Sequence, residues 1–267
     1  MATTFLSIRA DMLKPTLTHQ KEENLIIIRI GLVKTTEEMT QLSGELRDLC
    51  EEITFSPDIR VVVLTGADEN SFSIEPGICP PDSEKGEDPE TGIWSLAEPI
   101  AKLDLPVIAA INGDAMGQGL ELALACDIRI ASEGSRFALT HITSGFMPGD
   151  GGTQRLSRLI GKGKAIEMIL TGDRMDAQEA LQLGLVNRVV PSEKLEETAM
   201  QMAREMASKG PLAMRYAKEA INKGVDMTLE QGLRLEADLY FLLHTTQDRT
   251  EGIRMFQKKG VPQFQGK

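Results

Sequence analysis

The sequence predicts an α/β fold whose strands pair largely in parallel. Short runs of β-branched and aliphatic residues recur along the chain, and segments with helical spacing separate several of them. Strands that alternate with helices form parallel sheets, because each helix carries the chain back across the sheet. Beyond residue 191 only helical patterns follow. We therefore expect a core of residues 1–191 and a helical region of residues 192–267.

The expected strands are short and apolar, as buried strands are. They cover residues 24–30, 60–66, 106–113, 127–132 and 185–190. A helix is expected over residues 36–53, because apolar residues recur there on one face. Those residues are Met39, Leu42, Leu46, Leu49 and Ile53. In the C-terminal region, helices are expected over residues 193–208, 211–223, 229–243 and about 250–258.

Composition and charge exclude several classes of function. The chain has 267 residues, 41% of them hydrophobic, which predicts a packed core. A net charge of -11 argues against nucleic acid as a partner. The apolar runs are too short to span a membrane, and the N-terminus lacks the pattern of a signal peptide. The three cysteines fit no metal spacing, so we expect no metal site and a cytoplasmic protein.

A helix that begins with glycines follows the strand expected over residues 106–113. Gly117 and Gly119 open this helix, so free main-chain N–H groups and the positive end of the helix dipole are expected there. Such a helix start suits a developing oxyanion. Glu121 is the only ionisable residue between Met116 and Cys126. A carboxylate in such surroundings is either paired or a candidate for proton transfer, and its possible structural partners are two arginines, Arg129 and Arg136.

The stretch "THITSGFMPGDGG" contains His141 and Asp150, and His141 is one of only three histidines. Two interpretations stay open for the pair. In the first, Asp150 orients the imidazole of His141, which acts on water as a base. In the second, Asp150 is the N-cap of the helix that begins at Gly152.

The motifs of the chain resemble those of the crotonase family, the enoyl-CoA hydratases and isomerases. The resemblance lies in "LPVIAAINGDAMGQGLELALACDIRIAS", "PGDGGTQRLSRLIGKGKAIEMILTG", "AQEALQLGLVNRVVP" and "EGIRMFQKKGVPQF". It implies a crotonase-like spiral of ββα units, followed by a C-terminal helical trimerisation region. It also implies a homotrimer or a dimer of trimers that binds acyl-CoA thioesters, with coenzyme A as part of the substrate and no other cofactor.

The same resemblance assigns roles to individual residues. The two N–H groups of the family's oxyanion hole fall at Ile74 and Gln118. Glu121 matches the first catalytic glutamate, whereas His141 occupies the position of the second, so the two-carboxylate pattern is broken. Lys218 and Lys258 are possible contacts for the phosphates of coenzyme A.

Three hypotheses about function follow. The first is hydration, dehydration or isomerisation of an enoyl-CoA thioester through a stabilised enolate, with Glu121 as the principal acid and base and His141 in place of the second carboxylate. The second is hydrolysis of a carbon–carbon bond in a β-diketone or 3-oxoacyl compound by His141 and Asp150, because "HITSGFMPGD" and "SFSIE" resemble the 6-oxocamphor hydrolase branch of the superfamily. The third is a member that binds ligands without catalysis.

Overall fold

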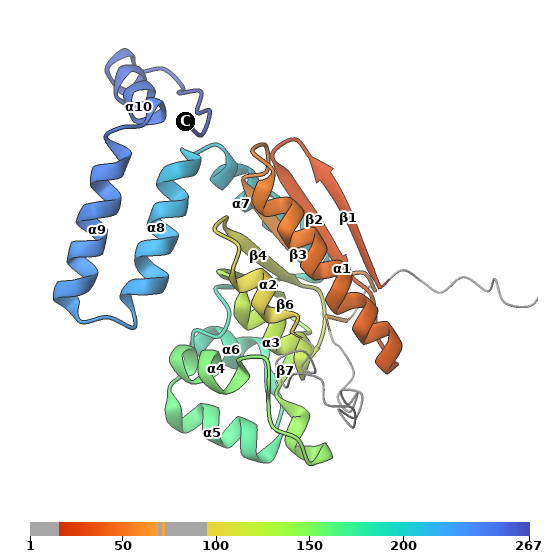
Figure 1. Cartoon of the computed structure of the whole chain (residues 1–267). Coiled ribbons are helices and arrows are strands. Elements are labelled where there is room, and N and C mark those ends of the chain that lie inside the picture. The colour runs from red at the N-terminus through yellow and green to blue at the C-terminus, as the bar shows by residue number, and fades with distance from the viewer. Residues whose placement is uncertain (1–15, 69–70, 73–94) are drawn as a thin grey trace, which may run out of the picture.

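The computed structural model describes residues 16–68, 71–72 and 95–267, and its centre is a six-stranded sheet (Figure 1). The strand order is β1 (Leu17–Glu22), β2 (Leu25–Ile30), β3 (Val61–Gly66), β4 (Val107–Ile111), β6 (Ile128–Ser132) and β9 (Arg188–Val190). β1 runs antiparallel to β2, and the other neighbours are parallel. The five predicted strands are confirmed, while β1 was not predicted.

A second, smaller sheet gives the fold its repeating unit. It consists of β5 (Ala115–Met116), β7 (Arg136–Ala138) and β8 (Met175–Asp176). β4 and β5 are followed by α3 (Gln118–Ala125), and β6 and β7 are followed by the 3-10 helix η1 (Thr140–Ser144) and α4 (Gly152–Ile160). These two turns of the chain therefore each add one strand to each sheet before a helix, as the predicted ββα spiral requires.

Helices cover both faces of the large sheet. On one face α1 (Thr36–Phe55) buries the predicted apolar stripe, and α2 (Ala97–Ala101) and α3 share the same core. On the other face α7 (Leu195–Ala207) buries Leu195, Ala199 and Ala203 against alternate residues of β2, β3, β4 and β6. α7 thus packs on the sheet, and the division of the chain after Pro191 stays a prediction.

The last three helices form an arm that projects from this body (Figure 1). α8 (Pro211–Gly224) and α9 (Leu229–Leu243) lie side by side, and α10 (Gln247–Lys258) follows them. Along the chain, the shorter elements α5 (Lys162–Thr171), α6 (Ala177–Gln182) and η2 (Ser192–Lys194) lie between α4 and α7. The predicted C-terminal helices are confirmed to within a few residues at each end.

Candidate active site

The start of α3 presents a main-chain donor that no described residue bonds. Gly117 precedes the helix at φ 53° and ψ -124°, a conformation that a side chain would disfavour. Its N–H donates to Ala138 O at 2.9 Å, and its carbonyl accepts the first bonds of the helix, from Leu120 N and Glu121 N. Among the described residues no acceptor bonds the N–H of Gln118. This N–H therefore lies at the positive end of the helix dipole, free to bind an oxyanion.

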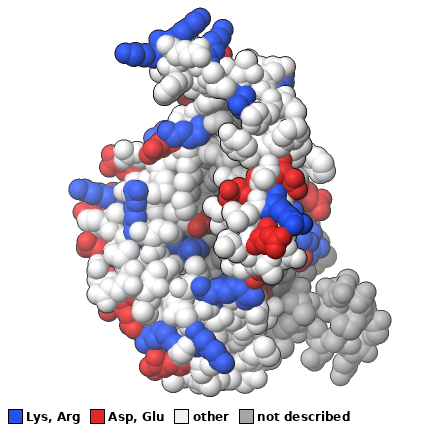
Figure 2. All heavy atoms as spheres, turned by 90° about the vertical axis from the view of Figure 1, so that its left-hand side faces the viewer, with Lys and Arg blue, Asp and Glu red and all other residues white. Residues whose placement is uncertain are grey.

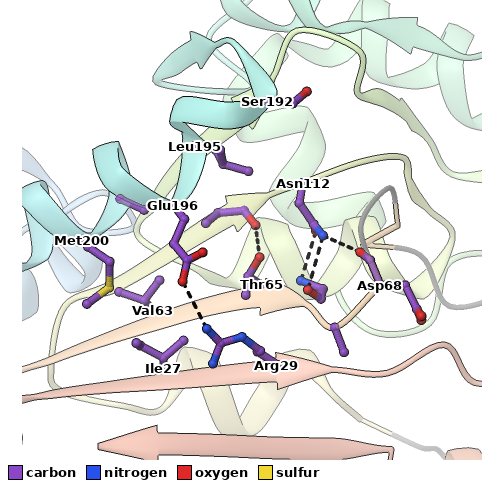
Figure 3. Close-up of a pocket in the computed structure, with 14 residues that line it drawn as sticks. Ile27, Arg29, Val63, Thr65, Asp68, Asn112, Ser192, Leu195, Glu196 and Met200 are labelled. Atoms are coloured by element: carbon purple, nitrogen blue, oxygen red, sulfur yellow. Dashed lines mark hydrogen bonds and ion pairs between the residues drawn. The ribbon is translucent and has the colours of Figure 1, made fainter. Parts of the chain in front are cut away.

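The chain segments that follow β3 and β4 run together, as the predicted oxyanion hole requires. The two strands are parallel neighbours, and beyond them Phe72 N donates to Asp114 O at 3.0 Å. The side chain of Asn112 accepts from Gly66 N at 3.1 Å and so fastens the turn before α3 to the end of β3 (Figure 3). Ile74 lies outside the described residues, so the position of its N–H stays a prediction.

Glu121 is fully buried, and its two carboxylate oxygens have different surroundings. Oε1 accepts hydrogen bonds from Asp150 N and Gly152 N, both at 2.8 Å, at the N-terminus of α4. A Cβ atom at Gly152 would lie 2.9 Å from this oxygen, so the approach requires glycine. Oε2 has no hydrogen bond to any residue that the structure describes. One oxygen is therefore fixed by main-chain donors, and the other is available for a substrate or water.

His141 faces the available oxygen of Glu121. Its Nε2 lies 3.2 Å from Glu121 Oε2, and its side chain is 13% exposed. The contact has the length of an ion pair without a hydrogen bond being formed. Four buried side-chain polar atoms in the described part of the chain lack a hydrogen-bond partner, and three of them gather here: Glu121 Oε2, His141 Nδ1 and Thr140 Oγ1. Such a cluster marks a place where a polar ligand or water binds.

Both predicted roles of Asp150 need correction, because its carboxylate is bonded elsewhere. Oδ1 accepts from Ser95 Oγ at 2.6 Å, and Oδ2 accepts from Leu96 N and Ala97 N, both at 2.7 Å. Asp150 therefore caps α2, and the N-cap of α4 is Gly151. The predicted hydrogen bond to His141 is not formed, since Nδ1 of that ring has no partner. Burial raises the pKa of the Asp150 carboxyl, although the hydrogen bonds from Ser95 and the main chain oppose the shift.

The two arginines considered as partners of Glu121 bind other groups. Arg129 is buried and donates to Leu185 O at 2.7 Å and to Cys126 O at 2.6 Å; burial lowers the pKa of its guanidinium. Arg136 pairs with Asp114 at 2.6 Å. His141 is therefore the one basic side chain that the structure places beside Glu121 within the described ranges.

Two cavities lie away from Glu121. One, of about 920 Å³, lies between the end of α3, α4 and α8 on the side of the molecule shown in Figure 2. Lys218, a predicted phosphate contact, lines it but already binds Asp127 Oδ2 and Leu105 O, both at 2.7 Å. The other, of about 250 Å³, lies between the sheet and α7, with the ion pair of Arg29 and Glu196 on its wall (Figure 3).

Two further observations concern metals and membranes. Within residues 16–68, 71–72 and 95–267, no group of three or more His, Cys, Asp or Glu side chains is arranged to hold a metal ion. Over the same ranges, no helix has both the length and the apolar character that crossing a bilayer requires.

Comparison with known proteins assigns the chain to a family. The family model of enoyl-CoA hydratase/isomerase matches residues 33–267. The putative enoyl-CoA hydratase/isomerase YngF of Bacillus subtilis is 39% identical over 250 residues, which cover 92% of this chain and 96% of that protein. The 2,3-dehydroadipyl-CoA hydratase of Escherichia coli is 46% identical over 175 residues, or 66% of this chain and 68% of that protein.

Solved structures agree. An enoyl-CoA hydratase from Bacillus anthracis has a TM-score of 0.81 at 39% identity and covers 94% of this chain and 100% of its own. Pseudomonas aeruginosa DspI has a TM-score of 0.84 at 32% identity and covers 96% of this chain and 100% of its own. The fold, the motifs and these matches together show that the chain belongs to the enoyl-CoA hydratase/isomerase family, the crotonase superfamily.

Proposed function

We propose that this protein hydrates an enoyl-CoA thioester, or shifts its double bond, through an enolate that main-chain N–H groups stabilise. The observation that carries the proposal is the placement of Glu121. Its carboxylate is fully buried, one oxygen is held by two N–H groups, and the other oxygen is unbonded beside His141. The N–H of Gln118, which bonds no described residue, lies on the same helix, one turn before it. The family supplies the substrate class.

For hydration, the groups fit a sequence of two proton transfers. Water forms a bond from its oxygen to the β-carbon, while Glu121 Oε2 takes one of its protons. The π electrons of the carbon–carbon double bond move toward the thioester carbonyl, whose oxygen becomes negative and binds the N–H of Gln118 and, we propose, that of Ile74. The proton on Glu121 then passes to the α-carbon, and the carbonyl is restored. These steps use no electron donor or acceptor, so we propose no cofactor beyond the coenzyme A of the substrate.

His141 takes the place of the second carboxylate in this proposal. An imidazole at 3.2 Å from Glu121 Oε2 is placed to hold the attacking water or to relay its proton. It differs from a carboxylate in charge and reach, so we expect slow hydration of crotonyl-CoA and faster turnover of a bulkier, cyclic enoyl ester. Hydrolysis of a carbon–carbon bond is less well supported, because Asp150 does not orient His141.

The test is a comparison of substrates on the purified full chain. Straight-chain and cyclic enoyl-CoA esters are followed by loss of the conjugated thioester absorbance, and cyclic β-diketones are followed by formation of the ring-opened keto acid. We expect turnover of enoyl-CoA esters alone. Turnover of diketones alone would replace the proposal with its alternative. A rise in melting temperature with CoA esters, but no turnover of either class, would indicate a ligand-binding member without catalysis.

The arm supports a proposal of self-association. Large apolar side chains on it are solvent-exposed in the single chain, among them Leu229 at 79%, Phe241 at 71% and Phe256 at 86%. Much of the face on the arm side is uncharged (Figure 2), and the 920 Å³ cavity opens between the arm and the body. Exposed apolar surface of this extent marks an interaction site. We propose that copies of this chain cover it in a homotrimer or in a dimer of trimers.

The cysteines support a proposal about compartment. Cys50 and Cys126 are both buried and unpaired. Burial raises the pKa of each thiol to about 12, which keeps it protonated and unreactive. Buried free thiols suit a reducing environment, and we propose the cytoplasm.

A further inference from the structure

The carboxylate of Glu121 depends on a loop for its position. Of the two N–H groups that hold Oε1, one belongs to Asp150 and the other to Gly152. Between them Gly151 has a φ of 93°, so this turn departs from helical geometry before α4 begins. Whatever fixes this turn also fixes Oε1, and with it the direction in which Oε2 points.

Asp150 is the residue that fixes this turn, since all its polar groups are bonded. Its N–H donates to Glu121, and its carbonyl accepts from Arg155 Nη1 at 2.7 Å. Its carboxylate accepts three further bonds, from Ser95 and from the first two N–H groups of the α2 region. A single residue therefore connects the carboxylate of Glu121 to α2.

The far end of this connection is rigid. Leu96, Ala97 and Ile100 are each 0% exposed, and Leu96 and Ile100 belong to the main core. Their backbone cannot shift without disturbing packed side chains, so the N–H groups that bind Asp150 are fixed donors. The Ser95 hydroxyl donates to Asp150 and accepts from Glu98 N at 3.0 Å, which fixes its orientation as well.

We propose that Asp150 is a positioning residue, which anchors the turn before α4 to α2 and thereby holds Glu121 in its productive orientation. The expected effect on kcat rests on the proposed hydratase or isomerase function. The carboxylate of Asp150 accepts hydrogen bonds from three donors of residues 95–97. Asp150 therefore acts through Glu121 and transfers no proton itself. A displacement of about 1 Å in such a group lowers the rate by up to about a hundredfold.

Two substitutions separate positioning from proton transfer. Asp150→Asn keeps an oxygen that accepts from Leu96 N and Ala97 N, and its amide donates to Ser95 Oγ, whereas Asp150→Ala removes every bond of the side chain. We expect kcat to fall about ten- to a hundredfold in Asp150→Ala with KM within about threefold of wild type. In Asp150→Asn we expect kcat to recover to within about threefold of wild type.

Asp176→Ala is the matched control for loss of a helix cap. Asp176 caps α6 by accepting from Glu179 N at 2.8 Å, and it does not contact Glu121. We expect this variant to lower the melting temperature but to leave kcat unchanged. Equal loss of kcat in Asp150→Asn and Asp150→Ala would overturn the proposal in favour of proton transfer by the carboxylate. Full kcat in Asp150→Ala would reduce Asp150 to a structural cap.

Hydrogen exchange keeps this test independent of the substrate. The amides of Asp150 and Gly152 should exchange faster in Asp150→Ala than in wild type, Asp150→Asn or Asp176→Ala. Faster exchange, in a protein whose wild type hydrates no ester, would uphold the anchoring of the turn and reject the proposed function. Unchanged exchange would reject the anchoring, whatever the wild type turns over.

Discussion

In the junction of α3, η1 and α4 charged groups are buried, whereas in the arm of α8, α9 and α10 large apolar groups are exposed. Glu121 is 0% exposed, yet Phe241 on α9 is 71% exposed. In the described part of the arm helices, burial is limited to Pro211, Leu239 and Asp248. Both regions depart from the usual distribution of polar and apolar residues, in opposite directions.

The difference indicates what each region lacks in the isolated chain. Main-chain donors satisfy one oxygen of Glu121, and the unbonded atoms that remain at the junction suit a small polar ligand. The arm instead leaves apolar side chains without neighbours, which only a surface of comparable size can cover. The junction therefore suits the proposed reaction site, and the arm suits the proposed interface between copies of the chain.

Replacing Glu121 should have the largest effect. Glu121→Gln keeps an oxygen for the N–H groups of Asp150 and Gly152 but removes the proton acceptor. We expect kcat for an enoyl-CoA ester to fall by about 10²- to 10⁴-fold with the melting temperature little changed. Glu219→Gln, which affects only an exposed pair with Lys223 on α8, is the control. A loss of less than about tenfold in Glu121→Gln would show that another group carries the proton.

Replacing Arg129, the buried arginine of β6, should lower stability more than activity. Arg129→Met removes the donor to Leu185 O and Cys126 O and leaves both carbonyls unbonded. We expect the free energy of unfolding in urea to fall by about 3 kcal/mol. Arg136→Met breaks an ion pair in which the arginine is half exposed, so we expect a smaller fall in the free energy of unfolding. A similar fall in the free energy of unfolding in the two variants would contradict the prediction that the buried arginine stabilises the fold more than the half-exposed one.

A charge on the arm should change assembly. Phe241→Glu places a carboxylate on the exposed apolar side of α9, and we expect it to shift the mass in analytical ultracentrifugation from the assembly toward a single chain. Because aromatic anchors at interfaces contribute at least about 1–2 kcal/mol, the dissociation constant should rise at least about tenfold. Phe55→Glu, on an exposed phenylalanine of α1 outside the arm, is the matched control. An unchanged mass for Phe241→Glu would place the interface elsewhere.

The pH dependence of stability should show the smallest effect. The pKa of Asp150 in the folded protein is raised above its ordinary value, mainly by burial. Stability that this group contributes at low pH is then lost as pH rises from about 4 through the folded pKa. Asp150→Asn does not titrate, so its melting temperature relative to wild type should increase from pH 4 to pH 7. A difference that stays constant with pH would show that the three hydrogen bonds cancel the effect of burial on this pKa.

Local patterns predicted most of the fold. The apolar stripe of α1, the buried strands and the all-helical C-terminus follow from residue spacing, since burial repeats with the period of the element. β5, β7 and β8 were missed because two or three residues are too few to show an alternation. Glu121 could be identified from a local pattern as well, because it is the single charge in an apolar helix.

The hydrogen-bond partners were decided by the tertiary structure. The sequence by itself singled out Glu121 as the one charge in an apolar helix and predicted that Gly117 and Gly119 open this helix. It did not determine that Glu121 binds the turn before α4, or that Asp150 caps α2 and not α4, although both residues stood out in the chain. Periodicity reports which side of an element is buried, but a side chain's partner depends on which elements meet, and these meet across 29 to 55 residues.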